Sequence, residues 1–279
     1  MEKIYELHND YFTDKHFIWQ VKHYYNKNCN IAKKLATVVW TSELTADKAM
    51  EKIESAANFC SKNDGTFLAV EDLHFLTKPL MYKLINLQPI YCGLTWNGEN
   101  NLAGGANSRA TLSNFGKMVV QSLEAADIIV DTAHLNEVSF MAVANNTTKP
   151  LFCSHTACAA INPHQRNLKD YQIKMIAGSG GLVGLCLVSN FLTGYNRSTI
   201  SDYVRHLDYA VCKFGIDHFA IGSDFCGTKH LPIGIVDYKS LSSGLAKQLL
   251  GLGYKQADID KLFWGNAERF FKQHSNLAL

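Results

Sequence analysis

The feature that most constrains the fold is the alternation of short apolar runs with longer amphipathic ones along the whole chain. Eight short runs have the length and composition of buried β-strands. They are Ile4–Leu7, Ala36–Trp40, Phe67–Val70, Ile90–Thr95, Ile128–Ala133, Leu151–Ser154, Leu182–Leu187 and Phe219–Ser223. Strands that alternate with helices form parallel βαβ units, and eight such units predict a closed barrel.

The segments between the strands have helical periodicity. The expected helices are Ala46–Cys60, Lys78–Leu87, Ser113–Ala126, Asn136–Asn145, Asp170–Ala177, Ser201–Phe214, Leu241–Leu250 and Gln256–Phe271. A length of 279 residues fits one α/β (β/α)8 TIM barrel, which takes about 250 residues, as well as two small domains. No repeat or Pro-rich linker marks a boundary, so residues 1–279 are expected to form a single catalytic domain.

An open doubly wound sheet is the competing fold. It would need a Gly-rich phosphate loop after an early strand. The pair Gly104-Gly105 is the only early Gly-rich segment, and it follows the fourth expected strand. The barrel is therefore favoured. The loop after that strand, Trp96 to Leu112, is long and polar, and long loops inside compact domains are usually functional.

Composition excludes several classes of function. Charged residues make up 19% of the chain, the formal net charge is +2, and the basic residues are scattered, so no nucleic-acid footprint is expected. The apolar runs fall short of the about 18 residues that a membrane span needs. The first residues, Met1 to Glu6, are too polar for an export signal, which predicts a soluble cytoplasmic protein. The eight cysteines include no C-x-x-C pair and are expected to be reduced thiols.

Residues suited to metal binding follow the expected strands. Active sites of barrel enzymes lie at the carboxyl ends of the strands. His8 and Asp10 follow the first strand and, two residues apart, should face the barrel mouth together, with Asn9 turned away. Glu71 and Asp72 follow the third strand, and only one of them should face the site.

Three more groups follow later strands, namely His134, His155 and Asp224. Imidazole nitrogen and carboxylate oxygen are the ligands that zinc takes. The set holds more such groups than one ion needs, which predicts two ions bridged by a carboxylate. Two neighbouring ions can ionise a shared water, giving a hydroxide nucleophile near neutral pH.

Longer motifs around these residues resemble those of the membrane dipeptidases, peptidase family M19. In chain order they are His8-Asn9-Asp10, Val70-Glu71-x-x-His74, Val130-Asp131-x-x-His134, Phe152-Cys153-Ser154-His155, Arg166-Asn167-Leu168, Gly222-Ser223-Asp224-Phe225-x-Gly227 and Gly265-Asn266-x-x-Arg269. The resemblance covers nearly the whole chain, from His8 to Arg269.

The resemblance implies a role for each candidate residue. His8 and Asp10 would bind one zinc ion, His134 and His155 would bind the other, and Glu71 would bridge the two. His, Asp and Glu side chains are all ordinary zinc ligands.

The remaining roles concern the substrate. Asp224 would handle the proton of the attacking water and pass one to the leaving amine. Arg166 would pair with the free carboxylate of the substrate, because its planar fork binds carboxylates bidentately. The animal enzymes of the family end their fourth strand in Leu-Thr-His, and that His polarises the scissile carbonyl. Here Trp96 replaces it, so the indole N–H or Asn97 would donate to the substrate instead. His74 matches a motif without being a ligand.

The resemblance therefore predicts a zinc-dependent dipeptidase acting on small dipeptides, including those with a C-terminal D-residue. Relatives are often homodimers, which predicts a homodimer here. Two alternatives stay open. One is a different binuclear-metal hydrolase acting on a lactone, cyclic amide or ester, which would not need Arg166 in the pocket. The other is a non-catalytic metal-binding accessory protein, which only Trp96 favours.

Overall fold

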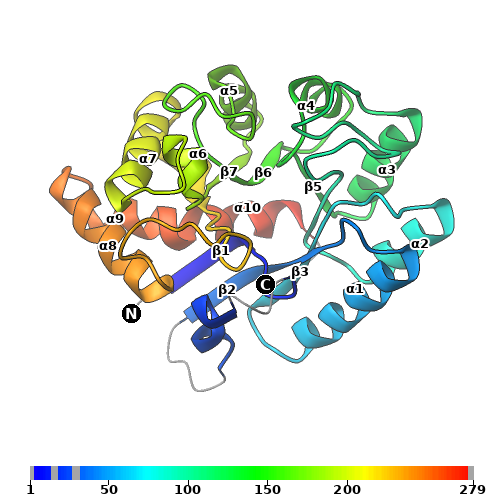
Figure 1. Ribbon diagram of the computed structural model, residues 1–279, viewed down its shortest axis with the longest axis horizontal. Helices are drawn as coiled ribbons and strands as arrows, with labels where there is room; N and C mark the ends of the chain where they lie inside the picture. The colour runs from blue at the N-terminus through cyan, green and yellow to red at the C-terminus, as the bar shows by residue number, and fades with distance from the viewer. Residues whose placement is uncertain (1–2, 14–17, 27–31, 276–279) are drawn as a thin grey trace.

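The structure is a computed structural model that describes residues 3–13, 18–26 and 32–275. Eight parallel strands pair in chain order and close into a barrel (Figure 1). They are β1 (Lys3–Asn9), β2 (Ala32–Trp40), β3 (Thr66–Glu71), β4 (Tyr91–Gly93), β5 (Ile129–Asp131), β6 (Phe152–Thr156), β7 (Leu182–Leu185) and β8 (Phe219–Ile221). Each expected strand is present, and the predicted (β/α)8 barrel is confirmed.

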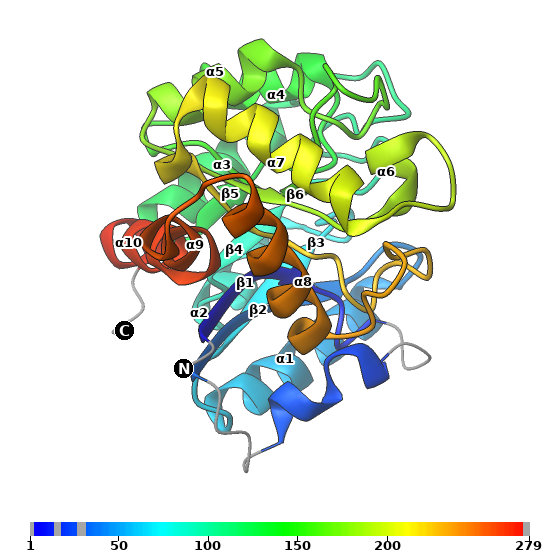
Figure 2. The same ribbon diagram turned by 90° about the vertical axis from the view of Figure 1, so that its left-hand side faces the viewer.

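Helices cover the outside of the barrel, as the two perpendicular views show (Figures 1 and 2). They are α1 (Ala46–Ser61), α2 (Lys78–Asn86), α3 (Asn114–Ala125), α4 (Glu137–Ala144), α5 (Asp170–Gly178), α7 (Ile200–Phe214) and α8 (Tyr238–Gly251). The short helix α6 (Ser189–Thr193) and the 3₁₀ turns η1 (Ile18–Gln20), η2 (Lys22–Tyr25) and η3 (Ile216–His218) were not expected from the sequence. Helix α7 begins after Thr199, one residue before the predicted start, because Thr199 and Asp202 form a capping box.

The expected helix Gln256–Phe271 is divided into three parts. Helix α9 (Gln256–Asp260) passes through a π-turn, η4 (Lys261–Gly265), into α10 (Asn266–His274). Side chains of α10 reach into the amino-terminal end of the barrel, where the ring of Phe270 stacks on Phe152 and that of Phe271 stacks on Tyr5. The end of the barrel opposite the expected active site is therefore filled.

Seven cysteines of the described residues are free thiols, and Cys29 lies outside those residues. None of the helices within residues 3–13, 18–26 and 32–275 combines the length and apolar character that crossing a membrane requires. The barrel wall is tightest where β6, β7 and β8 meet. A Cβ atom added at Gly184 of β7 would lie 1.9 Å from the carbonyl oxygen of Ser154.

We expect Gly184→Ala to destabilise the protein by about 1–3 kcal/mol, because an added methyl group would force backbone atoms of β6 and β7 apart. Urea unfolding of the metal-free protein measures this. Gly178→Ala is the matched control, since Gly178 ends α5 and an added Cβ there meets nothing within 4 Å. The control should be neutral or gain up to about 1 kcal/mol. Equal changes in the free energy of unfolding of the two variants would contradict the close packing of β6 against β7.

A buried histidine ties α7 to the segment after β6. Nδ1 of His206 accepts a hydrogen bond from the backbone N–H of Cys158 at 3.0 Å. Nε2 lies 3.0 Å from the carbonyl oxygen of Leu192, to which it donates. Only the neutral imidazole can make both bonds, because the protonated ring has no acceptor. Burial also lowers the pKa of His206 from its ordinary value.

The pKa of His206 lies lower in the folded than in the unfolded chain, where it is about 6.5. The unfolded chain therefore binds a proton at His206 more readily than the folded chain does. The stability that neutral His206 contributes above pH 6.5 is lost as the pH falls from 6.5 toward the lower pKa of the folded state. Between pH 7.5 and pH 5.5, the wild type should lose more free energy of unfolding than His206→Gln. Both proteins are measured with a chelator present, so that metal release does not contribute. Equal losses of free energy of unfolding in the two proteins would show that the protonation of His206 is not linked to folding.

Candidate metal centre

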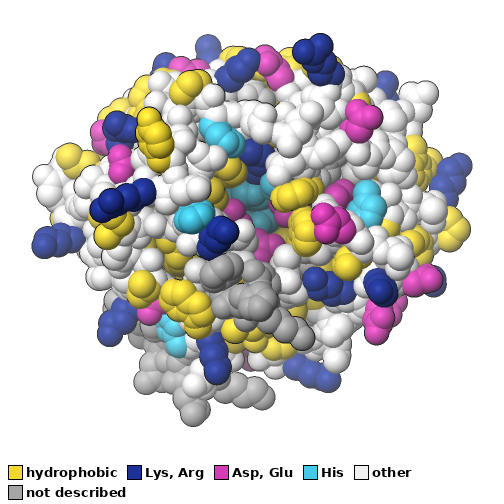
Figure 3. Space-filling view, in the orientation of Figure 1, with side chains coloured by type: hydrophobic (Ala, Val, Ile, Leu, Met, Phe, Trp, Pro, Cys, Tyr) yellow, Lys and Arg dark blue, Asp and Glu magenta, His cyan; other side chains and the backbone are white. Residues whose placement is uncertain are grey.

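Six acidic and imidazole side chains meet at the carboxyl end of the barrel. They are His8 and Asp10 from the end of β1, Glu71 from β3, His134 after β5, His155 from β6 and Asp224 after β8. Figure 3 shows histidine and acidic side chains at the bottom of a hollow in the centre of this face. The cavity there has a volume of about 540 Å³ and is lined by all of these except His8. That size lies within the range of small-molecule sites.

A bulge in β1 turns His8 toward this cluster of side chains. Leu7 packs inside the barrel, so plain alternation would turn His8 outward. Between Glu6 and Asn9, however, β1 contains one residue more than the paired part of β2. The carboxylate of Glu6 accepts hydrogen bonds from the backbone N–H groups of His8, at 2.9 Å, and Ser223, at 2.8 Å. Bulges often re-aim side chains beside active sites, and this one brings His8 inward.

A second bulge, in β6, has the same effect on His155. The thiol of Cys153 packs in the outer core. From Cys153 to Thr156, β6 again contains one residue more than β7. Ser154 and His155 consequently both face the site, although they are adjacent in sequence. The two bulges bring the rings of His8 and His155 to a centroid distance of 3.8 Å.

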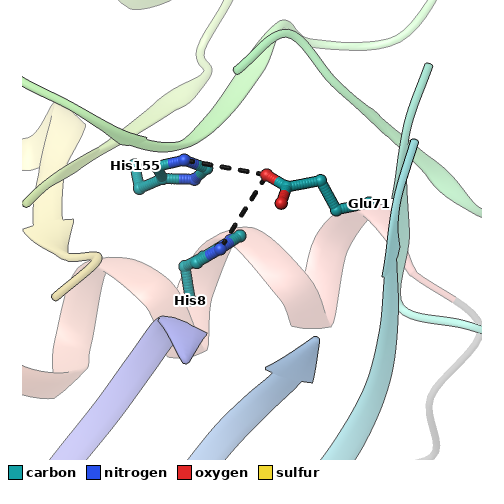
Figure 4. A group of neighbouring side chains, drawn as sticks. All are labelled: His8, Glu71 and His155. Atoms are coloured by element: carbon teal, nitrogen blue, oxygen red, sulfur yellow. Dashed lines mark ion pairs between the residues drawn. The ribbon is translucent and has the colours of Figure 1, made fainter. Parts of the chain in front are cut away.

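The Nε2 atoms of three imidazoles converge on one carboxylate oxygen. Oε1 of Glu71 lies 2.8 Å from Nε2 of His134, 3.8 Å from that of His155 and 4.0 Å from that of His8. Figure 4 shows His8 and His155 pointing at this oxygen from two different strands. Oδ2 of Asp10 lies 3.3 Å from Nε2 of His8. The predicted ligand set is thus brought together within a few Å.

Asp224 adds a second carboxylate beside His8, with its Oδ1 3.9 Å from Nε2 of His8. Gly227 makes room for it, because a Cβ atom at that position would lie 2.2 Å from Oδ1 of Asp224 and 2.3 Å from Oδ2 of Asp10. Asp224 and His134 have left-handed φ values of 62° and 67°, a conformation that costs energy for residues other than glycine. Such strain is typical of functional sites.

Asp72 lies next to Glu71 but is turned away from the cluster, also with a left-handed backbone, at φ 70°. Its carboxylate accepts hydrogen bonds from Ser42, from the side chain of Asn100 and from the backbone N–H of His74. Asp72 therefore organises the loops around the site. The ring of His74 bonds locally to a carbonyl oxygen of the loop before α1, away from the cluster.

The cluster has too little positive charge to balance its carboxylates, although contacts with Asp10 and Glu71 raise the pKa of His8 in spite of its burial. Burial raises the pKa of Glu71 well above its ordinary value, and burial together with the carboxylate of Asp10 does the same for Asp224. Burial lowers the pKa of His134 and of His155, which keeps both rings neutral with a free lone pair. A divalent cation would relieve the repulsion between these carboxylates and use those lone pairs.

The residues present fit such a metal. Two triplets have donor atoms within 4.8 Å of one another, His8–Glu71–His155 and His8–Asp10–Asp224. Nε2 of His8 and Oε1 of Glu71 are buried and take part in no hydrogen bond with any described residue. Buried polar atoms normally have partners, so two that lack them at the centre of a nitrogen and oxygen donor set indicate a metal site.

Arg166 and Trp96 lie beside the cluster. Arg166 is buried, and its Nη2 atom lies 2.9 Å from Nε2 of His155. Its guanidinium stands over the ring of Phe191, which lines the cavity. Trp96 also lines the cavity and makes a T-shaped contact with Trp40. Trp40 was not among the residues expected at the site, because its position at the end of β2 reads simply as part of an apolar strand.

Asn97 was expected to contact the substrate. Its side chain lines the cavity, but its Oδ1 atom lies 2.9 Å from Nδ1 of His134 and holds that ring. Ser154 was not expected at the site, but its hydroxyl contacts His8 and His155. Its position between Cys153 and His155 in a strand gives no local sign of this, since alternation predicts that it faces opposite to His155.

Comparison with known proteins places the chain in a family. The family model described as membrane dipeptidase (peptidase family M19) matches residues 15–279. An uncharacterised protein in the pqqA 5′ region of Klebsiella pneumoniae is 34% identical over 192 residues, which cover 64% of this chain and 70% of that protein. Dipeptidase aclJ of Aspergillus oryzae is 29% identical over 221 residues. The matched region covers 76% of this chain but only 52% of the fungal protein.

Solved structures share the fold. A metallo peptidase from Rhodobacter sphaeroides, liganded with a phosphinate mimic of the dipeptide L-Ala-D-Ala, superposes with a TM-score of 0.83 at 20% identity, covering 98% of this chain and 99% of that one. An amidohydrolase from Pseudomonas aeruginosa gives a TM-score of 0.84 at 19% identity, covering 99% and 97%. With the family model matching nearly the whole sequence, the chain belongs to the membrane dipeptidase family, peptidase family M19, and is a metallo-hydrolase of the dipeptidase type.

Proposed function

We propose that this chain is a zinc-dependent dipeptidase that holds two zinc ions. His8 and Asp10 would bind one ion and His134 and His155 the other, with Glu71 between them. The observation that carries this proposal is the convergence of three imidazole Nε2 atoms on one oxygen of Glu71, within 4.0 Å. Zinc is the metal that best matches this mixture of imidazole and carboxylate.

Bound zinc would acidify water to a pKa near neutrality and polarise a substrate carbonyl. The chain itself would move the protons. Asp224 lies on the side of His8 that faces the cavity, with its carboxylate 3.9 Å from Nε2 of that ring. From there Oδ1 can accept a proton from the attacking water and return it to the nitrogen of the leaving amine. Proton transfer by a positioned carboxyl group typically contributes 10²–10⁴-fold to the rate.

Arg166 would select a substrate with a free carboxylate. Its Nε atom is buried and has no hydrogen-bond partner among the described residues. No ion pair joins it to a carboxylate within the described part of the chain, so the buried cation is available to an anionic ligand. A carboxylate one residue beyond the scissile bond defines a dipeptide. The ligand of the Rhodobacter sphaeroides peptidase supports dipeptides with a C-terminal D-residue as substrates here.

The protein loaded with zinc should contain two ions per chain and hydrolyse dipeptides in a panel that includes L-Ala-D-Ala. Asp224→Asn should keep both ions and lose about 10²–10⁴-fold in kcat, because the amide cannot carry the proton. Metal analysis and an assay of released amino acids measure both effects. If the wild type binds two ions but hydrolyses no dipeptide of the panel, the dipeptidase proposal is wrong.

Arg166→Met should lower kcat/KM for dipeptides by about 10- to 100-fold, since hydrogen bonds to charged groups contribute about 1.5–3 kcal/mol. The matched substrate is the same dipeptide with its C-terminal carboxylate converted to an amide. Wild type and variant should hydrolyse that substrate at similar rates. Full activity of the variant on both substrates would favour a hydrolase of neutral lactones, cyclic amides or esters.

The cytoplasmic location and the homodimer stay predictions from the sequence. Gel filtration and fractionation of cells test the two predictions directly.

A further inference from the structure

We propose that Ser154 is a positioning residue shared by both metal sites, with one hydroxyl group orienting His8 and His155 together. The inference rests on the proposed two-metal function. Ser154 is fully buried beneath the cluster, in the bulge of β6. Its Oγ lies 2.9 Å from Nδ1 of His155 and 3.2 Å from Nδ1 of His8. In the proposed site these two rings bind different ions.

The direction of the hydrogen bonds follows from Asp131. Oδ1 of Asp131 accepts from the backbone N–H groups of Ala133 and Ser154, each at 2.9 Å, and Oδ2 accepts from the hydroxyl of Ser154. Burial raises the pKa of Asp131, but the three donors that converge on its carboxyl group stabilise the ionised form, which can only accept. The single hydroxyl proton of Ser154 is therefore committed to Asp131, and both of its lone pairs face the histidines.

The tautomer of His155 agrees with this arrangement. Arg166 Nη2 lies 2.9 Å from Nε2 of His155, and a guanidinium group can only donate. Nε2 therefore presents a lone pair, and the proton of the neutral ring is on Nδ1. That proton is donated to Ser154. The ring is thus held in the one tautomer that leaves Nε2 available to a metal.

His8 is held in the same tautomer by two acceptors. The hydroxyl of Tyr91 donates to the carbonyl oxygen of Leu7 at 2.8 Å, so toward Nδ1 of His8, at 3.0 Å, it can only accept. Ser154 offers the second acceptor, so Nδ1 of His8 carries a proton and Nε2 is the nitrogen that faces the cluster, 3.3 Å from Oδ2 of Asp10. Partners on the far ring nitrogen fix tautomer and orientation in metal sites, and their loss typically costs 10–100-fold in affinity.

His134 supplies a matched control. Its Nδ1 atom contacts Oδ1 of Asn97 and not Ser154. Loss of the Ser154 hydroxyl should therefore weaken the binding of both ions. Loss of the Asn97 amide should weaken the binding of only the ion held by His134. The two variants separate a shared support from an ordinary one.

The test is a zinc titration of the metal-free protein against a chromophoric chelator, which resolves two dissociation constants. Ser154→Ala should raise both constants by about 10- to 100-fold, and Asn97→Ala should raise only one. An unchanged pair of constants in Ser154→Ala, or a change in only one, would overturn the proposal. A wild type that binds no zinc would instead refute the two-metal function, so the two failures are distinguishable.

Asp131→Asn keeps the side-chain shape and reverses one hydrogen bond. The introduced amide would donate to the hydroxyl of Ser154, which must then turn its own proton toward one of the two histidines. That ring can accept it only by giving up its own proton on Nδ1. Histidine ¹⁵N chemical shifts of the metal-free protein report which ring nitrogens carry protons. We expect Nδ1 of both rings to carry a proton in the wild type and Nδ1 of one ring to lose it in this variant. Unchanged shifts in the variant, or a wild-type ring without a proton on Nδ1, would overturn the proposed support.

Discussion

The structure depends on keeping three carboxylates and three imidazoles, all of them buried except the partly buried Asp224, within a few Å of one another at one end of the barrel. Burying ionised groups without opposite charge is costly, and the raised pKa of Glu71 reflects that cost. Arg166 is the only basic side chain other than histidine that the described residues place against the cluster, through its bond to His155. Its one charge cannot balance three carboxylates. The cluster is therefore suited to bind a multivalent cation.

The barrel alone would not bring these groups together, because its strands alternate strictly between inside and outside. Two bulges break the alternation where it matters. In β1 the interior residue Leu7 is followed directly by His8, and in β6 Ser154 is followed directly by His155. Each bulge places two adjacent residues on the inner side. In β1 only His8 of the two faces the candidate metal site, whereas in β6 both residues face it. Glu6 satisfies the backbone amide of His8 that the first bulge removes from strand pairing.

The sequence predicts the barrel well because parallel strands that are buried on both faces consist of continuous apolar runs, and such runs are local patterns. It predicts strand ends poorly: the run Ile90–Thr95 continues past β4, which pairs only over Tyr91–Gly93, since the apolar residues beyond it pack without strand pairing. The π-turn within Gln256–Phe271 escaped prediction because its apolar periodicity stays helical throughout. The supporting roles of Ser154 and Asn97 depend on residues distant in sequence, so no local pattern reveals them.

The groups that contact the far ring nitrogens of the three clustered histidines are neutral oxygens: the hydroxyls of Tyr91 and Ser154 and the amide of Asn97. A carboxylate in direct contact would orient a ring equally well but would add negative charge to a cluster that already has too much. Asp131 stands one bond further back, behind Ser154, where backbone N–H groups satisfy it. Asp131 also acts on His8 through space, and its hydrogen bond polarises the hydroxyl of Ser154, which strengthens the orientation of both imidazoles. Neutral acceptors thus let this barrel support three imidazoles at the lowest electrostatic cost.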